Sequence, residues 1–168
     1  KSLKNLKSDG FTKKIGISIY DFRILNKILR KFKFDLIQAP LNILDRRLVE
    51  KGWLNKIKER KMEVHVRSIF LQGILLLKSN QLPQKLEKLK ENWKIWDNWL
   101  NKNHFNSLQV CLSYVLKHKK IDGIIIGHNN KNQLNEILNF KRIKKKFFLP
   151  NLNIKNKKLI DPIEWLKF

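Results

Sequence analysis

Three polar side chains stand within or at the end of apolar runs, where a ligand-binding group is easily recognised. Ser18 lies near the end of the run 14–19, and its hydroxyl can hydrogen-bond an amide. Gln38 lies within the run 34–39 and needs partners, which are either a ligand or neighbouring side chains. Arg67 carries a planar guanidinium that can stack on a flat ring, pair with a phosphate or form a salt bridge.

Two further features suit phosphate groups. Gly73 allows a backbone to approach a ligand closely. Asn130 and Gln133 have capping-box spacing, which predicts a well-formed helix N-terminus. Such a terminus attracts phosphate, although a plain capped helix explains the same two residues.

Groups for nucleophilic or metal chemistry are scarce. Cys111 is the one cysteine, which excludes internal disulfides and Cys-rich zinc sites. It falls on the apolar face of a predicted helix, so we expect inert core. Trp93, Trp96 and Trp99 follow helical spacing and are interpreted as packing. We therefore expect no metal site.

Short apolar runs alternate with amphipathic segments along the chain. The predicted strands are 14–19, 34–39, 63–70 and 121–127. The predicted helices are 1–10, 21–32 capped by Asp21, Asp45 to about Arg60, 82–101, 106–117 and 131–139. Apolar strands alternating with helices predict an α/β fold with four parallel strands and outer helices, either a small open sheet or half of a barrel. The tail 148–168 lacks periodicity and is expected to pack over a helix or a barrel face.

Composition narrows the function classes. The net charge of +23 comes from 30 Lys but only 7 Arg, beside 18 Asn and a single Ala. We attribute this bias to an A/T-rich genome, and therefore disfavour a nucleic-acid partner. No apolar run reaches the roughly 20 residues of a membrane helix, and no signal peptide is visible. We expect a cytoplasmic protein without a membrane partner, and interpret the basic run 141–150 as a solvated helix end rather than a membrane contact.

Four segments together resemble the aldo/keto reductase family: KIGISIYD (14–21), FDLIQAPLNILDRR (34–47), EVHVRSIFLQGILL (63–76) and IDGIIIGHNNKNQLNEI (121–137). The resemblance is closest to the branch found with surface-polysaccharide or nucleotide-sugar genes. It implies the last four strands of a (β/α)8 TIM barrel, so residues 1–168 would be one partial domain, the C-terminal half. Because the chain begins at Lys1, we interpret it as a fragment.

The resemblance also implies a set of NADP(H)-binding residues, with NAD(H) as the alternative cofactor. Those at the nicotinamide end are Ser18, Gln38, Arg67 and Ser68. Those of the pyrophosphate loop are Phe70, Leu71, Gln72 and Gly73. Those of the adenosine end are Gly127, His128, Asn130, Gln133 and Glu136. Many members have Lys where Gly127 stands, which keeps NAD(H) open as the cofactor.

The family places its catalytic Asp, Tyr, Lys and His on the first four strands, and nothing here matches them. Tyr20 follows the wrong strand, and the histidines do not match either: His65, His104, His118 and His128. We therefore expect the cofactor-binding half of an oxidoreductase that acts on aldehyde, ketone or sugar carbonyls, inactive by itself. We expect it to pair with an N-terminal half barrel. The alternatives are a non-catalytic nucleotide-binding half barrel that dimerises, or a basic nucleic-acid-binding protein.

Overall fold

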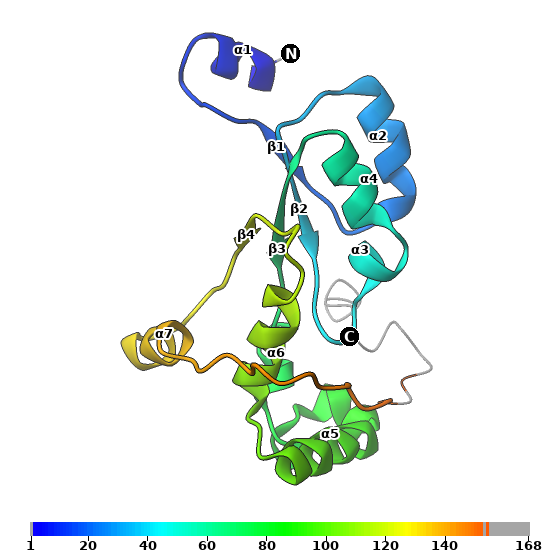
Figure 1. The fold of residues 1–168 in the computed structure, drawn as a ribbon, viewed down its shortest axis with the longest axis vertical. Coiled ribbons are helices and arrows are strands. Elements are labelled where there is room, and N and C mark those ends of the chain that lie inside the picture. The colour runs from blue at the N-terminus through cyan, green and yellow to red at the C-terminus, as the bar shows by residue number, and fades with distance from the viewer. Residues whose placement is uncertain (1, 153, 155–168) are drawn as a thin grey trace. The chain divides into compact units, whose positions relative to one another are not determined.

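The computed structural model describes residues 2–152 and 154, which form two compact units. The sheet unit comprises the described residues of 1–41, 45–68 and 118–126. The helical unit comprises 42–44, 69–117 and the described residues from 127 onward. Figure 1 shows the elements of both units along the chain.

The sheet unit holds four parallel strands, which confirms the predicted α/β arrangement. They are β1 (Gly16–Ser18), β2 (Leu36–Pro40), β3 (Glu63–Arg67) and β4 (Gly123–Ile124). Their spatial order, β1-β2-β3-β4, equals their order in the chain. All three pairs are parallel. Each strand is shorter than its apolar run, and β3 ends because Ser68 takes a left-handed conformation with φ 57°.

The two faces of this sheet differ. On one face Ile37, Ala39, Val64 and Val66 are fully buried. On the other face, Gln38, His65 and Arg67 are half-buried. Helices α2 (Leu25–Lys31) and α4 (Trp53–Glu59) lie along one side of the sheet in Figure 1. The alternation follows from the period of two along each strand.

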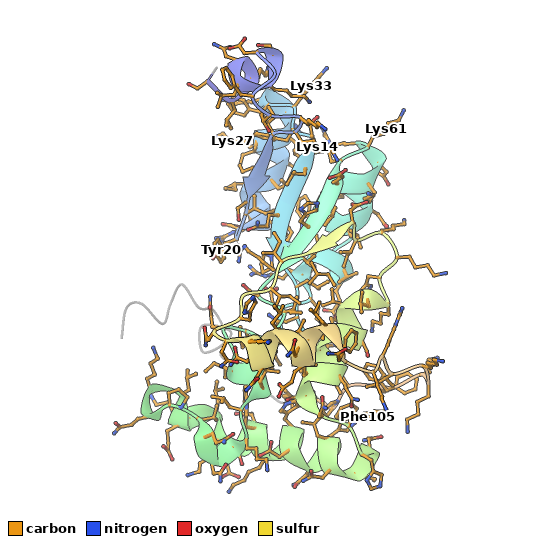
Figure 2. The ribbon with its side chains drawn as sticks, turned by 90° about the vertical axis from the view of Figure 1, so that its left-hand side faces the viewer. Lys14, Tyr20, Lys27, Lys33, Lys61 and Phe105 are labelled. Atoms are coloured by element: carbon orange, nitrogen blue, oxygen red, sulfur yellow. The ribbon has the colours of Figure 1, made fainter. Side chains whose placement is uncertain are left out.

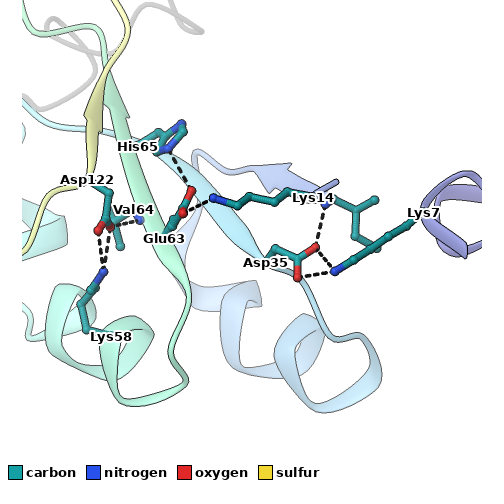
Figure 3. Close-up of polar contacts among 9 residues, drawn as sticks. Lys7, Lys14, Asp35, Lys58, Glu63, Val64, His65 and Asp122 are labelled. Atoms are coloured by element: carbon teal, nitrogen blue, oxygen red, sulfur yellow. Dashed lines mark hydrogen bonds and ion pairs between the residues drawn. The ribbon is translucent and has the colours of Figure 1, made fainter. Parts of the chain in front are cut away.

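Two aspartates fix the register at the amino ends of the strands (Figure 3). Asp35, just before β2, accepts a hydrogen bond from the Ile15 N–H at 2.8 Å. It is also ion-paired with Lys7. Asp122, just before β4, accepts a hydrogen bond from the Val64 N–H at 2.7 Å and is ion-paired with Lys58. Between them, Glu63 pairs with Lys14.

The remaining helices of the sheet unit correct one prediction. Helix α1 spans Ser2–Ser8, and the 3-10 helix η1 (Phe22–Ile24) precedes α2 with Asp21 as its N-cap. The prediction of a single helix from Asp45 to about Arg60 is wrong. The segment forms α3 (Arg47–Glu50) and α4, separated at Gly52, whose φ of 73° no helix accommodates.

The helical unit contains α5 (Lys90–Asn103), α6 (Ser107–Leu116) and α7 (Lys131–Leu138). Three 3-10 helices precede α5: η2 (Ile74–Leu76), η3 (Ser79–Gln81) and η4 (Gln84–Leu89). The predicted helix 82–101 therefore begins as a 3-10 turn after Pro83. The expected packing role of the tryptophans agrees with the burial of Trp93 and Trp96, whose Nε1–H groups donate to the carbonyls of Ile74 and Leu75.

The run 141–150 is not a helix end, contrary to expectation. α7 stops at Leu138, and the run continues without regular structure. The Ile143 N–H donates to the Ser113 hydroxyl of α6, and Phe147 packs edge-on against Phe105. Within the tail, Leu152 is buried, and its carbonyl accepts from Asn92 of α5. Residues 153 and 155–168 of the predicted tail lie outside the described part of the chain.

Candidate functional site

Three predicted site residues meet at the carboxyl ends of neighbouring strands of the sheet unit. Parallel pairing sets Ser18 of β1 beside Gln38 of β2, and the Ser18 hydroxyl donates to Gln38 Oε1 at 3.1 Å. Arg67 ends β3, and its Nε–H donates to the Ser18 Oγ at 3.4 Å. The sequence analysis singled out these residues as polar positions in apolar runs, and the parallel strand register brings them together.

Gln38 is satisfied at only one end of its amide. Its oxygen accepts from Ser18, whereas its Nε2 has no hydrogen-bond partner among residues 2–152 and 154. A neighbouring side chain therefore satisfies the amide oxygen of Gln38 but not its NH2 group. The Nε2 donor is available to a ligand acceptor.

Arg67 is held by more contacts than sequence reasoning foresaw. Its Nη1 donates to the Ser68 hydroxyl at 3.3 Å, and its Nη2 donates to the Ile19 carbonyl at 3.1 Å. Its guanidinium carbon lies 3.7 Å from the centre of the Tyr20 ring. The family resemblance gives Tyr20 no role, although its position two residues after Ser18 places it at the same strand end. Figure 2 labels Tyr20 and Lys14 at the two ends of β1.

The loop that follows β3 belongs to the helical unit from Ile69 onward. Leu71, Gln72 and Gly73 all have positive φ, at 48°, 55° and 85°. This left-handed turn is unusual for residues other than glycine. The side chains of Phe70 and Leu71 are buried, so only their backbone can meet a ligand.

The N–H groups of this turn are open. No hydrogen bond from the N–H of Leu71, Gln72 or Gly73 occurs within the described part of the chain, whereas Ile74 and Leu75 donate back to Leu71 and Phe70. Consecutive N–H groups in a turn of this kind suit an anion. Backbone conformations of this kind are found more often at ligand-binding sites than elsewhere.

Five predicted residues of the adenosine end lie in α7 or in the segment before it, and all are exposed: Gly127, His128, Asn130, Gln133 and Glu136. Asn130 is the N-cap, and its Oδ1 accepts from the Gln133 N–H at 3.0 Å. The Gln133 Oε1 accepts from the Asn129 N–H at 2.8 Å, one residue earlier than a capping box requires. A Cβ at Gly127 would meet no atom within 4 Å, so a longer side chain would fit there.

The cysteine, histidine and acidic side chains of the described residues do not gather into a metal site. Residues 2–152 and 154 contain no group of three or more His, Cys, Asp or Glu side chains that could hold a metal. Cys111 is buried in α6, and burial raises the pKa of its thiol. The Nε2 of His65 lies 3.5 Å from the Oε2 of Glu63, the first residue of β3. None of the helices among the described residues is long and apolar enough to span a membrane.

Comparison with known proteins gives one family. The sequence model of the Aldo/keto reductase family matches residues 1–148. No curated protein matches the sequence.

Solved structures give the same fold. The aldo-keto reductase AKR11C1 from Bacillus halodurans in its holo form matches with a TM-score of 0.60 at 23% identity, over 80% of this chain and 46% of that one. The glycerol dehydrogenase AKR11B4 from Gluconobacter oxydans matches with a TM-score of 0.53 at 16% identity, over 88% of this chain and 56% of that one. This chain therefore spans about half the length of the proteins it matches. The predicted half of a TIM barrel is confirmed.

Proposed function

The chain belongs to the aldo/keto reductase family, and from this we propose that it is the cofactor-binding half of an NADP(H)-dependent oxidoreductase. Its substrates would be aldehydes, ketones or sugar carbonyls. When bound, NADP(H) supplies the hydride that reduces the carbonyl. Family membership and the set of side chains at the strand ends support this proposal, and a cytoplasmic location goes with it.

The observation that carries the proposal is the half-satisfied amide of Gln38. A nicotinamide carboxamide offers an oxygen that accepts and an NH2 group that donates. Gln38 Nε2 can donate to the first, and Ser18 Oγ, which has acceptor capacity beyond Arg67, can accept from the second. A ligand amide would thus pair the polar groups that the sheet leaves open.

The helical unit suits the phosphate-bearing part of the cofactor. The open N–H groups of Leu71, Gln72 and Gly73 would bind the pyrophosphate. The capped N-terminus of α7 would face the adenosine part. Because position 127 is glycine, NAD(H) stays the alternative cofactor, and the affinities for NADPH and NADH would decide between them.

We propose that the chain alone does not catalyse the reduction. No residue in the segments that resemble the family stands where the family has its catalytic Asp, Tyr, Lys and His. The general acid would then come from an N-terminal half barrel. Oxidation of NADPH by the purified 168-residue chain, with a carbonyl substrate, would contradict this.

Titration of the purified chain with NADPH, followed by tryptophan fluorescence, tests cofactor binding. We expect saturable binding that Gln38→Met weakens about tenfold, because a hydrogen-bond partner of the amide is removed. Gln84→Met, at an exposed position of η4, is the matched control and should leave binding unchanged. Absence of NADPH binding, or equal effects of the two substitutions, would refute the assignment.

The unpaired sheet edges favour a second candidate. β1 pairs only with β2, and β4 only with β3, among the described residues. Such edges bind other strands. A non-catalytic half barrel that dimerises would bind NADPH yet remain inactive when the N-terminal half of a family member is added, which distinguishes it from the first proposal.

A further inference from the structure

Within the described part of the chain, neutral groups alone hold the guanidinium of Arg67 in place. Three hydrogen bonds and the Tyr20 ring hold it at the carboxyl ends of β1 and β3. No carboxylate of residues 2–152 or 154 forms an ion pair with it, although Arg23, Arg46 and Arg47 each have one. A half-buried charge without an opposite charge is costly, and a bound anion would offset that cost.

The hydrogen-bond count shows which part of Arg67 is open. A guanidinium has five N–H donors: one on Nε and two on each terminal nitrogen. Its three hydrogen bonds come from three different nitrogens, to Ser18, Ser68 and the Ile19 carbonyl. One donor therefore remains on Nη1 and one on Nη2. Two donors on neighbouring nitrogens can bind a carboxylate or a phosphate in bidentate fashion.

We propose that Arg67 is an oxyanion receptor that binds a carboxylate or phosphate of the molecule held at these strand ends. The inference rests on the proposed function and deepens it. If the oxyanion belongs to the substrate, the preferred carbonyl compounds are acids, such as 2-oxoacids or sugar acids. If it belongs to the cofactor, Arg67 binds the pyrophosphate.

Calorimetric titrations with three probes distinguish these sources. Pyruvate presents a carbonyl with a carboxylate, acetone a neutral carbonyl of similar size, and inorganic pyrophosphate the cofactor's anion. Wild type is compared with Arg67→Met, Arg67→Lys and Arg30→Met. Arg30 is an exposed arginine of α2 in the same unit and serves as the matched control. NADPH is titrated in parallel.

We expect wild type to bind pyruvate but not acetone, and Arg67→Met to weaken oxyanion binding tenfold or more, the scale of a charge-assisted hydrogen bond. Arg67→Lys should recover part of the affinity, because it keeps the charge and loses the fork. If Arg67→Met loses pyruvate binding, the oxyanion belongs to the substrate. Loss of pyrophosphate and NADPH binding, with pyruvate unaffected, assigns it to the cofactor.

The inference is overturned if wild type binds neither anion, or if Arg67→Met behaves like Arg30→Met towards both. NADPH binding that persists in that case leaves the proposed function intact. Anion binding through Arg67 without any NADPH binding refutes the proposed function instead. Thermal unfolding of each variant checks the fold, and Arg67→Lys carries the test if Arg67→Met lowers the midpoint.

Discussion

At the scale of single residues, the contact between Tyr20 and Arg67 gives the side chain of the arginine one fixed orientation. The aromatic ring lies 3.7 Å from the guanidinium carbon, a stacking contact that attracts the cation and excludes water from that side. Because Arg67 also bonds Ser18, the tyrosine acts on the proposed nicotinamide-binding groups through the arginine. In the proposed site, Tyr20 would therefore act as a positioning residue.

We predict that Tyr20→Leu weakens binding of the oxyanion probe two- to fivefold, since a cation–π contact at a partly exposed site contributes about 0.5–1 kcal/mol. Tyr20→Phe keeps the ring and should retain wild-type affinity. Titration of both variants with the probe that wild type binds checks this. Equal losses in the two variants would assign the effect to the hydroxyl and not to stacking.

At the scale of the elements, Asp35 and Asp122 make the sheet sensitive to acid. Each carboxylate binds a backbone N–H of the neighbouring segment and a lysine, and we call these two groups the aspartate clamps. The hydrogen bond from Lys7 and the Ile15 N–H lower the pKa of Asp35. Partial burial would raise the pKa of Asp122, but Lys58 and the Val64 N–H together lower it. The unfolded chain therefore binds protons more readily at these groups, and the clamps contribute fully above the unfolded pKa of about 4.

We predict that the free energy of unfolding falls as the pH drops from about 5 towards 2, through the lowered pKa values of these carboxyls. Asp122→Asn should lower stability by about 1 kcal/mol at pH 7, the scale of a lost hydrogen bond, and flatten this pH dependence. Urea unfolding across this range measures both. Glu59→Gln, at an exposed position of α4, is the control, and a parallel pH curve for both variants would contradict the clamp.

The sequence predicted the existence of the elements better than their ends. Short apolar runs located all four strands, because strands in a covered parallel sheet are apolar along most of their length. Gly52 was not recognised as a break, since the amphipathic pattern continues across it and only the backbone dihedral reveals the turn. The left-handed turn at Leu71 and Gln72 was equally invisible, because neither residue type signals a positive φ.

For the candidate site too, the sequence predicted some features and not others. The sequence singled out Ser18, Gln38 and Arg67 as polar residues within or at the end of apolar runs, and their binding role came from the family resemblance. Tyr20 was missed because its contact depends on the direction of the Arg67 side chain, which pattern alone does not give. The same holds for the three hydrogen bonds of the guanidinium.

At the scale of the whole molecule, the chain corresponds to 46% of one matched barrel and 56% of another. A sheet that ends in β1 and β4 has two edges with unpaired backbone groups in the described chain. The half-buried face with Gln38, His65 and Arg67 corresponds to the interior of a complete barrel. These features favour association with another half barrel.

We predict a mass above the 20.2 kDa of the single chain in light scattering after size exclusion, either alone or mixed with the N-terminal half of a family member. Ile125→Lys, at a residue that is 43% exposed directly after β4, should return the mass to that of the monomer. Ile95→Lys, on an exposed position of α5, should not. A monomeric wild type under both conditions would argue against pairing.

The agreement between strand order and chain order also bears on how the sheet is made during translation. From β2 onward each strand pairs with the one before it; the aspartate before β2 bonds Ile15, next to β1, and the aspartate before β4 bonds Val64 of β3. The contacts among β1, β2 and β3 close comparatively short loops, which lowers the entropic barrier to folding, whereas β4 is separated from β3 by a long segment. The first three strands can therefore assemble in turn as the chain leaves the ribosome, each using its finished neighbour as the template.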